Sequence, residues 1–308
     1  MKVAMLGTGP FVVPTLRALH ASTHDVALVV SRPPRGRKRE PSPMQVAAEE
    51  LGLPAWTPET VNCDESRAEL NSRGLDLLVV CDYGEILKRA TLETARLGGV
   101  NLHGSLLPKY RGAAPVQWAV YHGEAVTGST VIQMTPGLDA GPILGVDEVA
   151  VDPDETAEEL EARLSQSGAP LVVRVVDQLE AGTAEGVPQD VSLATKAPRL
   201  RKEDGLIDWA RTALEIKNQV RALQPWPRAY TLWQRGTGEP MRLILHSADV
   251  SEGSASDPGT VSLLNGQLAV ATGGGLLLPK TVQPTGKKAM AADEFLRGYQ
   301  LREGDRIG

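Results

Sequence analysis

The stretch Asn101-Leu-His-Gly-Ser-Leu-Leu-Pro108 decides the fold class. It continues an apolar run that begins at Val100, and such a run predicts a short buried strand. Side chains alternate faces along a strand, so Asn101 and His103 are expected to point the same way. A strand that ends in polar groups and a Gly-Ser turn is typical of an open α/β sheet, where ligands bind beyond the carboxyl ends of the strands. The sequence therefore predicts a ligand site at the end of this strand.

A second turn, Gly137-Leu-Asp-Ala-Gly141, offers a carboxylate between glycines, which let a backbone approach a ligand closely. An amide donor and an imidazolium can stabilise an oxygen that becomes negative in a tetrahedral transition state. A carboxylate near the imidazole orients it and favours its charged form. No nucleophile accompanies these groups, since Ser105 is not in a Gly-x-Ser-x-Gly elbow and neither cysteine is near. This chemistry indicates direct acyl transfer without a covalent enzyme intermediate.

The string from Asn101 to Gln117 closely resembles the signature of methionyl-tRNA formyltransferases, within the 10-formyltetrahydrofolate-dependent formyltransferase family. The turn around Asp139 resembles the aspartate loop of that family, and residues 83–87 resemble its Tyr-Gly-x-Ile-Leu loop beside the pterin. The resemblance implies that Asn101, His103 and Asp139 are the catalytic trio. It implies a folate site lined by Tyr83, Gly84, Ile86, Leu87, Ser105, Leu106, Leu107, Pro108, Gly137 and Leu138. For residues 83–87 the alternative is a strand-end turn with a core Tyr and Leu.

The charge of the chain is unevenly distributed. The 308 residues carry a net charge of −6, yet residues 207–308 hold 12 Lys and Arg against 10 Asp and Glu. That part is therefore slightly basic, at +2, and residues 1–206 carry −8. The acidic total argues weakly against a nucleic-acid partner, because phosphate binding favours basic surfaces, but local basic segments matter more.

Three basic segments are candidates for RNA contact: residues 32–43, the pair Arg201-Lys202, and residues 283–290. The proline-rich stretch 32–43 is expected to be an exposed loop, which the resemblance places at the tRNA acceptor end. Residues 283–290 resemble the Gln-Pro-x-Gly-Lys-Lys-x-Met signature of the family. The candidate tRNA-binding residues are Arg35, Arg37, Lys38, Arg39, Arg201, Lys202, Lys287 and Lys288. For the first loop the alternative is a solvated charged surface, and for the last signature a basic turn before a helix.

The first residues predict a Rossmann-like start: a strand at 3–6, the turn Gly7-Thr-Gly9 and a helix over 11–21. A dinucleotide fingerprint would need a third glycine where Val12 stands, so a tight turn without cofactor is favoured. The expected fold class is α/β. Residues 1–187 form a Rossmann-like formyltransferase catalytic domain, 188–206 a linker, and 207–308 a C-terminal OB-like tRNA-binding β-barrel.

The expected function is transfer of a formyl group from 10-formyltetrahydrofolate, as co-substrate, to the α-amino group of methionyl initiator tRNA. Alternatives are the same transfer to a small amine of sugar-nucleotide type, and a nucleotide-dependent oxidoreductase. Cys63 and Cys81 lie far apart in the sequence and are expected to be free thiols, and no metal site is expected. No stretch approaches a membrane span, so a cytoplasmic protein without membrane partner is expected, as a monomer.

Overall fold

The computed structural model describes residues 1–34, 40–234, 238–253 and 257–308. The chain divides into two compact units. The first contains residues 1–115, 126–150 and 161–198, and the second contains residues 116–125, 151–160 and 199–308. The predicted domain limits at 187 and 207 stay a prediction.

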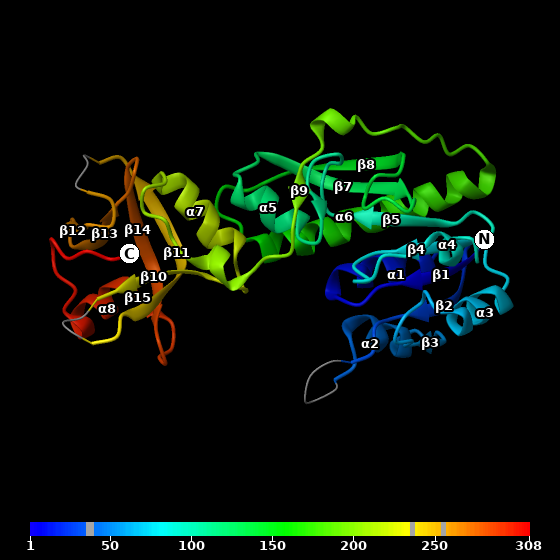
Figure 1. Cartoon of the computed structure of the whole chain (residues 1–308), viewed down its shortest axis with the longest axis horizontal. Coiled ribbons are helices and arrows are strands. Elements are labelled where there is room, and N and C mark those ends of the chain that lie inside the picture. Colours follow the sequence, from blue (N-terminus) through cyan, green and yellow to red (C-terminus); the bar gives the residue numbers. More distant parts are fainter. Residues whose placement is uncertain (35–39, 235–237, 254–256) are drawn as a thin grey trace. The chain divides into compact units, whose positions relative to one another are not determined.

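A seven-stranded sheet forms the centre of the first unit (Figure 1). Its strands, in spatial order, are β3 (Ala55–Trp56), β2 (Asp25–Val30), β1 (Lys2–Leu6), β4 (Leu77–Val80), β5 (Gly99–His103), β7 (Val126–Gln133) and β8 (Ile143–Ala150). Neighbours from β3 to β5 pair in parallel, whereas β7 and β8 are antiparallel. The predicted α/β class is confirmed, because parallel strands here alternate with helices.

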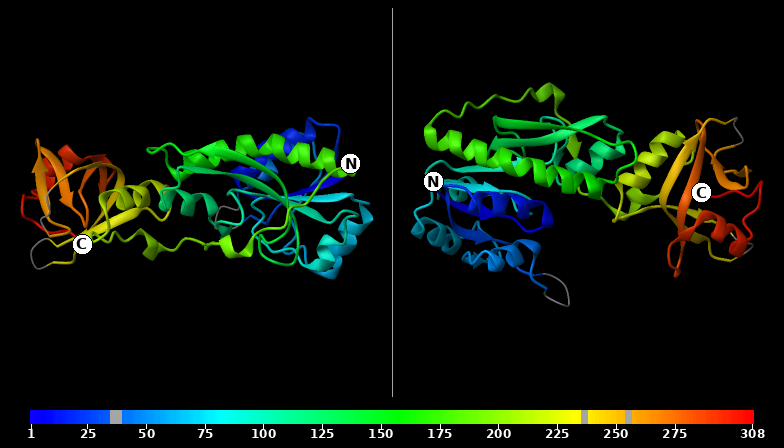
Figure 2. Two further views of the ribbon diagram at one scale, coloured as in Figure 1. Left: turned by 90° about the horizontal axis from the view of Figure 1, so that it is seen from above. Right: turned by 180° about the vertical axis from the view of Figure 1, so that it is seen from behind.

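Helices cover both faces of this sheet. Their bounds are α1 (Val13–His20), α2 (Pro43–Glu50), α3 (Asp64–Ser72), α4 (Arg89–Leu92) and α6 (Ala157–Ala181), with a 3-10 turn η1 (Pro10–Val12). On α6, Gly168 meets Leu102 of β5, and Ser165 donates a hydrogen bond to the carbonyl of Phe11. The view from above in Figure 2 shows α6 and α1 on one side of the sheet and α3 on the other.

The central parallel strands of the first unit are apolar because both faces of the sheet are covered there. All four residues of β4, Leu77–Val80, are buried, as expected for a central parallel strand. Caps fix where the helices begin: Ser42 and Gln45 form a capping box at α2, and Thr156 and Glu159 exchange hydrogen bonds before α6. In the sequence, the spacing of Thr156 and Glu159 predicts the second of these caps, and the hydrogen bonds confirm it.

The second unit contains an antiparallel sheet, which confirms the predicted C-terminal β domain. Its strands are β10 (Ala229–Trp233), β11 (Met241–Ser251), β14 (Leu276–Pro284), β13 (Gln267–Ala271) and β12 (Val261–Leu264), in spatial order, with β15 (Met290–Ala291) beside β14. Its helices are α7 (Ala213–Ala222) and α8 (Ala292–Tyr299), and most of α5 (Pro115–Tyr121) belongs to it. Phe295 of α8 is fully buried against Trp233, with ring centroids 5.9 Å apart.

Two predicted segments differ from the structure. Apolar residues at helical spacing predict a helix over 208–223, but α7 begins after Thr212, whose side chain forms a capping box with Glu215. The expected linker contains the 3-10 turns η2 (Val191–Leu193) and η3 (Lys202–Gly205) and a short strand β9 (Lys196–Ala197). Strand β9 pairs in parallel with β6 (Arg111–Gly112), so this segment is partly ordered by the first unit. No described helix is both long and apolar enough to cross a membrane.

Candidate active site

The last residues of β5 carry the first two members of the predicted trio. Asn101 lies between Val80 of β4 and Ile132 of β7, so the loop that follows β4 begins beside it. Asn101 is half-buried, and its side-chain amide makes no hydrogen bond to any other described residue. His103 lies two residues further, on the same face of the strand. An amide without an internal partner is therefore available to a ligand next to the imidazole.

The orientation of the His103 ring is fixed by the backbone. Its side chain is 6% exposed, and Nε2 lies 2.9 Å from the carbonyl oxygen of Tyr110. A carbonyl only accepts hydrogen bonds, so Nε2 carries a hydrogen and donates it. The other ring nitrogen, Nδ1, is turned toward Asp139 and lies 3.8 Å from its Oδ2. Nδ1 is therefore the nitrogen that can exchange a proton in the site.

Asp139 is held by the backbone on the opposite side. It has a positive φ of 47°, in the hairpin loop between β7 and β8, and its side chain is 13% exposed. The amide of Gly112 donates a 2.9 Å hydrogen bond to Oδ2, the same oxygen that faces His103. The 3.8 Å separation is too long for a direct hydrogen bond, so Asp139 acts on the imidazole through its charge. The structure thus brings His103 and Asp139 together, with Asn101 two residues before His103 on the same face of β5.

The Ser105 to Pro108 segment is tied to the protein by its own polar groups. The Ser105 hydroxyl is fully buried and donates to the carbonyl of Lys109 at 2.7 Å. Thr130 of β7 donates to the Ser105 carbonyl at 2.7 Å and accepts from the Leu107 amide at 3.2 Å. The peptide bond before Pro108 is cis. Leu106 and Pro108 are half-buried and offer apolar surface beside the trio, whereas the Ser105 hydroxyl is already used.

The loop after β4 divides into buried and exposed positions. Tyr83 and Leu87 belong to the apolar core, with 2% and 1% of their surface exposed. Gly84, at a positive φ of 79°, is exposed, and Ile86 is 62% exposed. Side-chain contact with a ligand from this loop is thus restricted to Ile86, together with the backbone. In the aspartate loop Gly137 and Leu138 are both exposed, Leu138 at 54%.

Comparison with known proteins decides the family. The profile described as "Formyl transferase" matches residues 1–176, and that described as "Formyl transferase, C-terminal domain" matches residues 199–300. The methionyl-tRNA formyltransferase of Solibacter usitatus is 43% identical over 312 residues, covering 100% of this chain and 99% of that protein. That of Acidobacterium capsulatum is 44% identical and covers 100% of both chains. This chain belongs to the methionyl-tRNA formyltransferase family.

Solved structures support the same fold at much lower identity. An N-formyltransferase from Helicobacter canadensis, in complex with folinic acid and dTDP-3-aminofucose, superimposes with a TM-score of 0.68 at 16% identity. The match covers 91% of this chain and 99% of the other. A glycinamide ribonucleotide transformylase from Symbiobacterium toebii covers only 62% of this chain, at a TM-score of 0.52 and 22% identity. The formyltransferase fold is therefore shared, and the family uses a folate donor.

The carboxylate of Glu85 holds the loop after β4 in place, a role that the sequence did not predict. It pairs with Arg32 at 2.7 Å, and both side chains are 17% exposed. The same carboxylate accepts hydrogen bonds from the Thr60 hydroxyl, from the Asn62 amide at 2.7 Å and from the Val61 amide at 3.3 Å. These partners come from segments 23 to 53 residues away, so no local pattern could reveal the cluster.

In this formyltransferase Asp82 lies against the Gly7-Thr-Gly9 turn, at the place where a dinucleotide-binding fold would bind a phosphate. Its carboxylate lies against the turn, because a Cβ at Gly9 would lie 2.1 Å from Oδ2, and its backbone carbonyl accepts the Thr8 amide at 3.0 Å. The amides at the start of a Rossmann helix ordinarily bind a phosphate of the cofactor. Here a carboxylate of the chain lies at that place and takes up the space next to Gly9 that a phosphate would need.

The basic residues predicted to contact tRNA fall into two groups. Arg35, Arg37, Lys38 and Arg39 lie outside the described residues. Arg201, Lys202, Lys287 and Lys288 are exposed, and none of the four forms an ion pair with a described carboxylate. Lys280 differs, because its Nζ lies 2.6 Å from Asp249. The four exposed side chains are available to an anionic partner.

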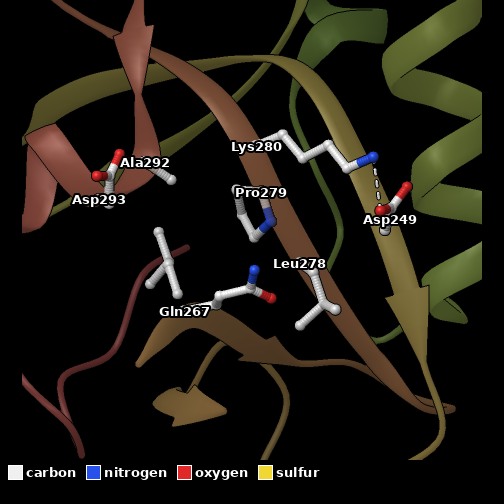
Figure 3. A pocket seen from close by; sticks show the side chains of 8 residues that line it. Asp249, Gln267, Leu278, Pro279, Lys280, Ala292 and Asp293 are labelled. Carbon is white, nitrogen blue, oxygen red and sulfur yellow. Dashed lines mark ion pairs between the residues drawn. The ribbon is translucent and has the colours of Figure 1, made fainter. Parts of the chain in front are cut away.

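The C-terminal unit also contains a hollow of about 240 Å³ between β13, β14 and the start of α8 (Figure 3). Lys280 crosses its rim to the ion pair with Asp249, and Leu278, Pro279 and Gln267 line its wall. Its cation is thus already neutralised. None of its lining residues belongs to the predicted catalytic or folate set.

Proposed function

We propose that this formyltransferase moves the formyl group of 10-formyltetrahydrofolate to the α-amino group of methionyl initiator tRNA, and that Asn101, His103 and Asp139 carry the chemistry. The observation that supports this most directly is the open amide of Asn101 beside the inward-facing Nδ1 of His103. An amide donor and a charged imidazole together suit an oxygen that gains negative charge. The folate and tRNA contacts of individual residues are part of the same proposal.

In the proposed reaction the amine nitrogen attacks the formyl carbon, whose oxygen is stabilised by Asn101 and by His103. The bond from that carbon to N10 of the folate then breaks, and the proton lost by the amine ends on N10. An α-amino group has an ordinary pKa of about 7.7–8.0, so a modest push deprotonates it near neutral pH. Asp139 supports the positive charge on His103 from 3.8 Å without itself taking the proton.

The two rival functions fit less well. Relatives above 40% identity along the whole chain are methionyl-tRNA formyltransferases, whereas the sugar N-formyltransferase is only 16% identical. A nucleotide-dependent oxidoreductase conflicts with Asp82, whose carboxylate lies against Gly9 in the turn. The acyl-transfer site and the family agree, so we retain formylation of methionyl-tRNA.

A single-turnover assay with formyl-labelled 10-formyltetrahydrofolate tests this function. Charged methionyl initiator tRNA is compared with free methionine and with a dTDP-amino sugar. We expect label on the tRNA alone, and a large loss of that label in His103→Ala. Label on the amino sugar, or an unchanged rate in His103→Ala, would contradict the proposal.

RNA contact by the C-terminal signature has a matched control in the same strand region. Lys287 is exposed and unpaired among described residues, whereas Lys280 is neutralised by Asp249. We expect Lys287→Ala to lower the slope of log affinity against log salt by about 0.7–0.9, the effect of one lost phosphate contact. Lys280→Ala should leave the slope unchanged. Equal slopes for both variants would argue against phosphate contact at Lys287.

A further inference from the structure

The segment that follows α6 forms one wall of the active site. Its residue Thr195 accepts the Arg111 amide on its carbonyl at 2.9 Å and the Tyr110 amide on its hydroxyl at 2.8 Å. The carbonyl of Ala197 accepts the amide of Ala113 at 2.8 Å. The signature loop after β5 is thereby paired, residue by residue, with a stretch of chain that the sequence marked only as a linker.

Gln189 is the first residue of this wall, which comprises residues 189–197, and every polar atom of its side-chain amide forms hydrogen bonds. Its Nε2 donates to the carbonyl of Asp139 at 2.9 Å and to the carbonyl of Gly141 at 2.8 Å. Its Oε1 accepts from Nε and Nη2 of Arg111 at 3.2 and 2.6 Å. Both donors and both acceptor positions are occupied. One half-buried amide therefore joins the signature loop to the loop that carries Asp139.

The aspartate loop needs such a support. Asp139 has a positive φ, which is unfavourable for a residue with a Cβ. Gly141 fits only because it lacks a Cβ, which would lie 1.7 Å from the carbonyl oxygen of Gln133. Gly112 fixes the Asp139 carboxylate, but only Gln189, among the described residues, bonds with its side chain to the backbone of this loop at both residues 139 and 141.

We propose that Gln189 is a positioning residue of the formyl transfer, which sets the distance between the Asp139 carboxylate and Nδ1 of His103. The inference rests on the proposed function, because it requires Asp139 to act in the reaction. Only an amide meets the demands of the place. A glutamate keeps the acceptor for Arg111 but puts oxygens against the two loop carbonyls, and a methionine keeps the volume but makes none of the bonds.

Gln189 contributes to the rate by holding the Asp139 carboxylate in place, so the effect of its loss depends on how far that carboxylate moves. A misplacement of about 1 Å can cost about 10²-fold in rate when a reacting group loses its alignment. Loss of four hydrogen bonds around an exposed loop permits a shift of that order. We expect Gln189→Met and Gln189→Glu each to lower the single-turnover rate at saturating substrates by about 10- to 100-fold.

The test is a double-mutant cycle with Asp139→Asn, since a residue that acts only through Asp139 has nothing left to position in that variant. We expect Gln189→Met to slow the wild-type background strongly and the Asp139→Asn background by less than about threefold. Gln219→Met is the matched control: Gln219 also joins an arginine, Arg211, to two backbone carbonyls, but in the C-terminal unit. Its single-turnover rate at saturating tRNA should stay within about threefold of wild type.

The outcomes distinguish failure of the positioning role of Gln189 from failure of the proposed function. An equal slowing by Gln189→Met in both backgrounds, or a wild-type rate in Gln189→Glu, overturns the positioning role while leaving the proposed function intact. A wild-type rate in Asp139→Asn overturns both. If Gln189→Met fails to fold, Gln189→Glu carries the same cycle, because it retains the acceptor for Arg111.

Discussion

Replacement of Asn101 by alanine separates catalysis from folding in an unusually clean way. The amide makes no hydrogen bond to a described residue, so its removal leaves no buried partner unsatisfied. We expect the free energy of unfolding to change by no more than about 0.5 kcal/mol. Loss of one donor to a developing oxyanion costs about 2.7–4 kcal/mol of transition-state stabilisation, or about 10²–10³ in turnover.

The assay follows formyl transfer in a single turnover at saturating folate and methionyl-tRNA, with folate binding and thermal unfolding measured on the same preparations. Asn62→Ala is the control, because the Asn62 amide bonds the Glu85 carboxylate at 2.7 Å and the Ile86 carbonyl at 3.0 Å. Its loss should weaken folate binding and stability more than the chemical step. A tenfold or smaller slowing in Asn101→Ala, with chemistry rate-limiting, would refute the oxyanion role.

Three further predictions follow from single contacts. Glu85→Leu should lower the free energy of unfolding in urea by about 2–4 kcal/mol, because it leaves the half-buried Arg32 without its carboxylate. Adding Arg32→Leu to this variant should recover part of the lost stability. Burial raises the pKa of Tyr83 to about 12, and its hydroxyl makes no hydrogen bond to a described residue, although Arg32 lies nearby. In the unfolded chain the same hydroxyl has a pKa of about 10. Stability should therefore fall from pH 10 to 12 by up to about 2.7 kcal/mol, and Tyr83→Phe should remove this fall while leaving stability at pH 7.5 nearly unchanged. Burial also raises the pKa of the Cys81 thiol, so a thiol reagent should modify Cys63 in the native protein and spare Cys81 until unfolding; equal rates would contradict this.

Local patterns predicted the parts of the fold that local physics determines. The strand at Asn101 and His103 and the box at Thr156 depend on residues within a few positions of each other, and both were found. Glu85 and Gln189 were missed because their partners lie up to 53 and 78 residues away. Gln189 also falls in a stretch without periodicity, where hydrogen bonds to another segment, rather than a buried face, fix the backbone.

The predicted start of α7 was wrong although the signal that fixes it is local. Apolar spacing from Trp209 onward continues the helical period backwards, so periodicity alone extends the helix too far. The hydroxyl of Thr212 accepts the Glu215 amide and ends that extension, while Trp209 is buried and donates its indole N–H to Thr231 at 3.0 Å. A capping pair in the sequence is therefore better evidence for a helix start than the first apolar residue.

The wall formed by residues 189–197 has a consequence for biosynthesis. Asp139 leaves the ribosome 50 residues before Gln189, which at about 5–20 residues per second is an interval of about 3–10 s. During that interval the nascent chain already contains the three proposed catalytic side chains but not the Gln189 amide, which bonds both the signature loop and the aspartate loop. On the proposed role of Gln189, the site is completed late in synthesis, and a fragment that preserves it extends at least to Gln189, within the first compact unit, whose last residue is Pro198.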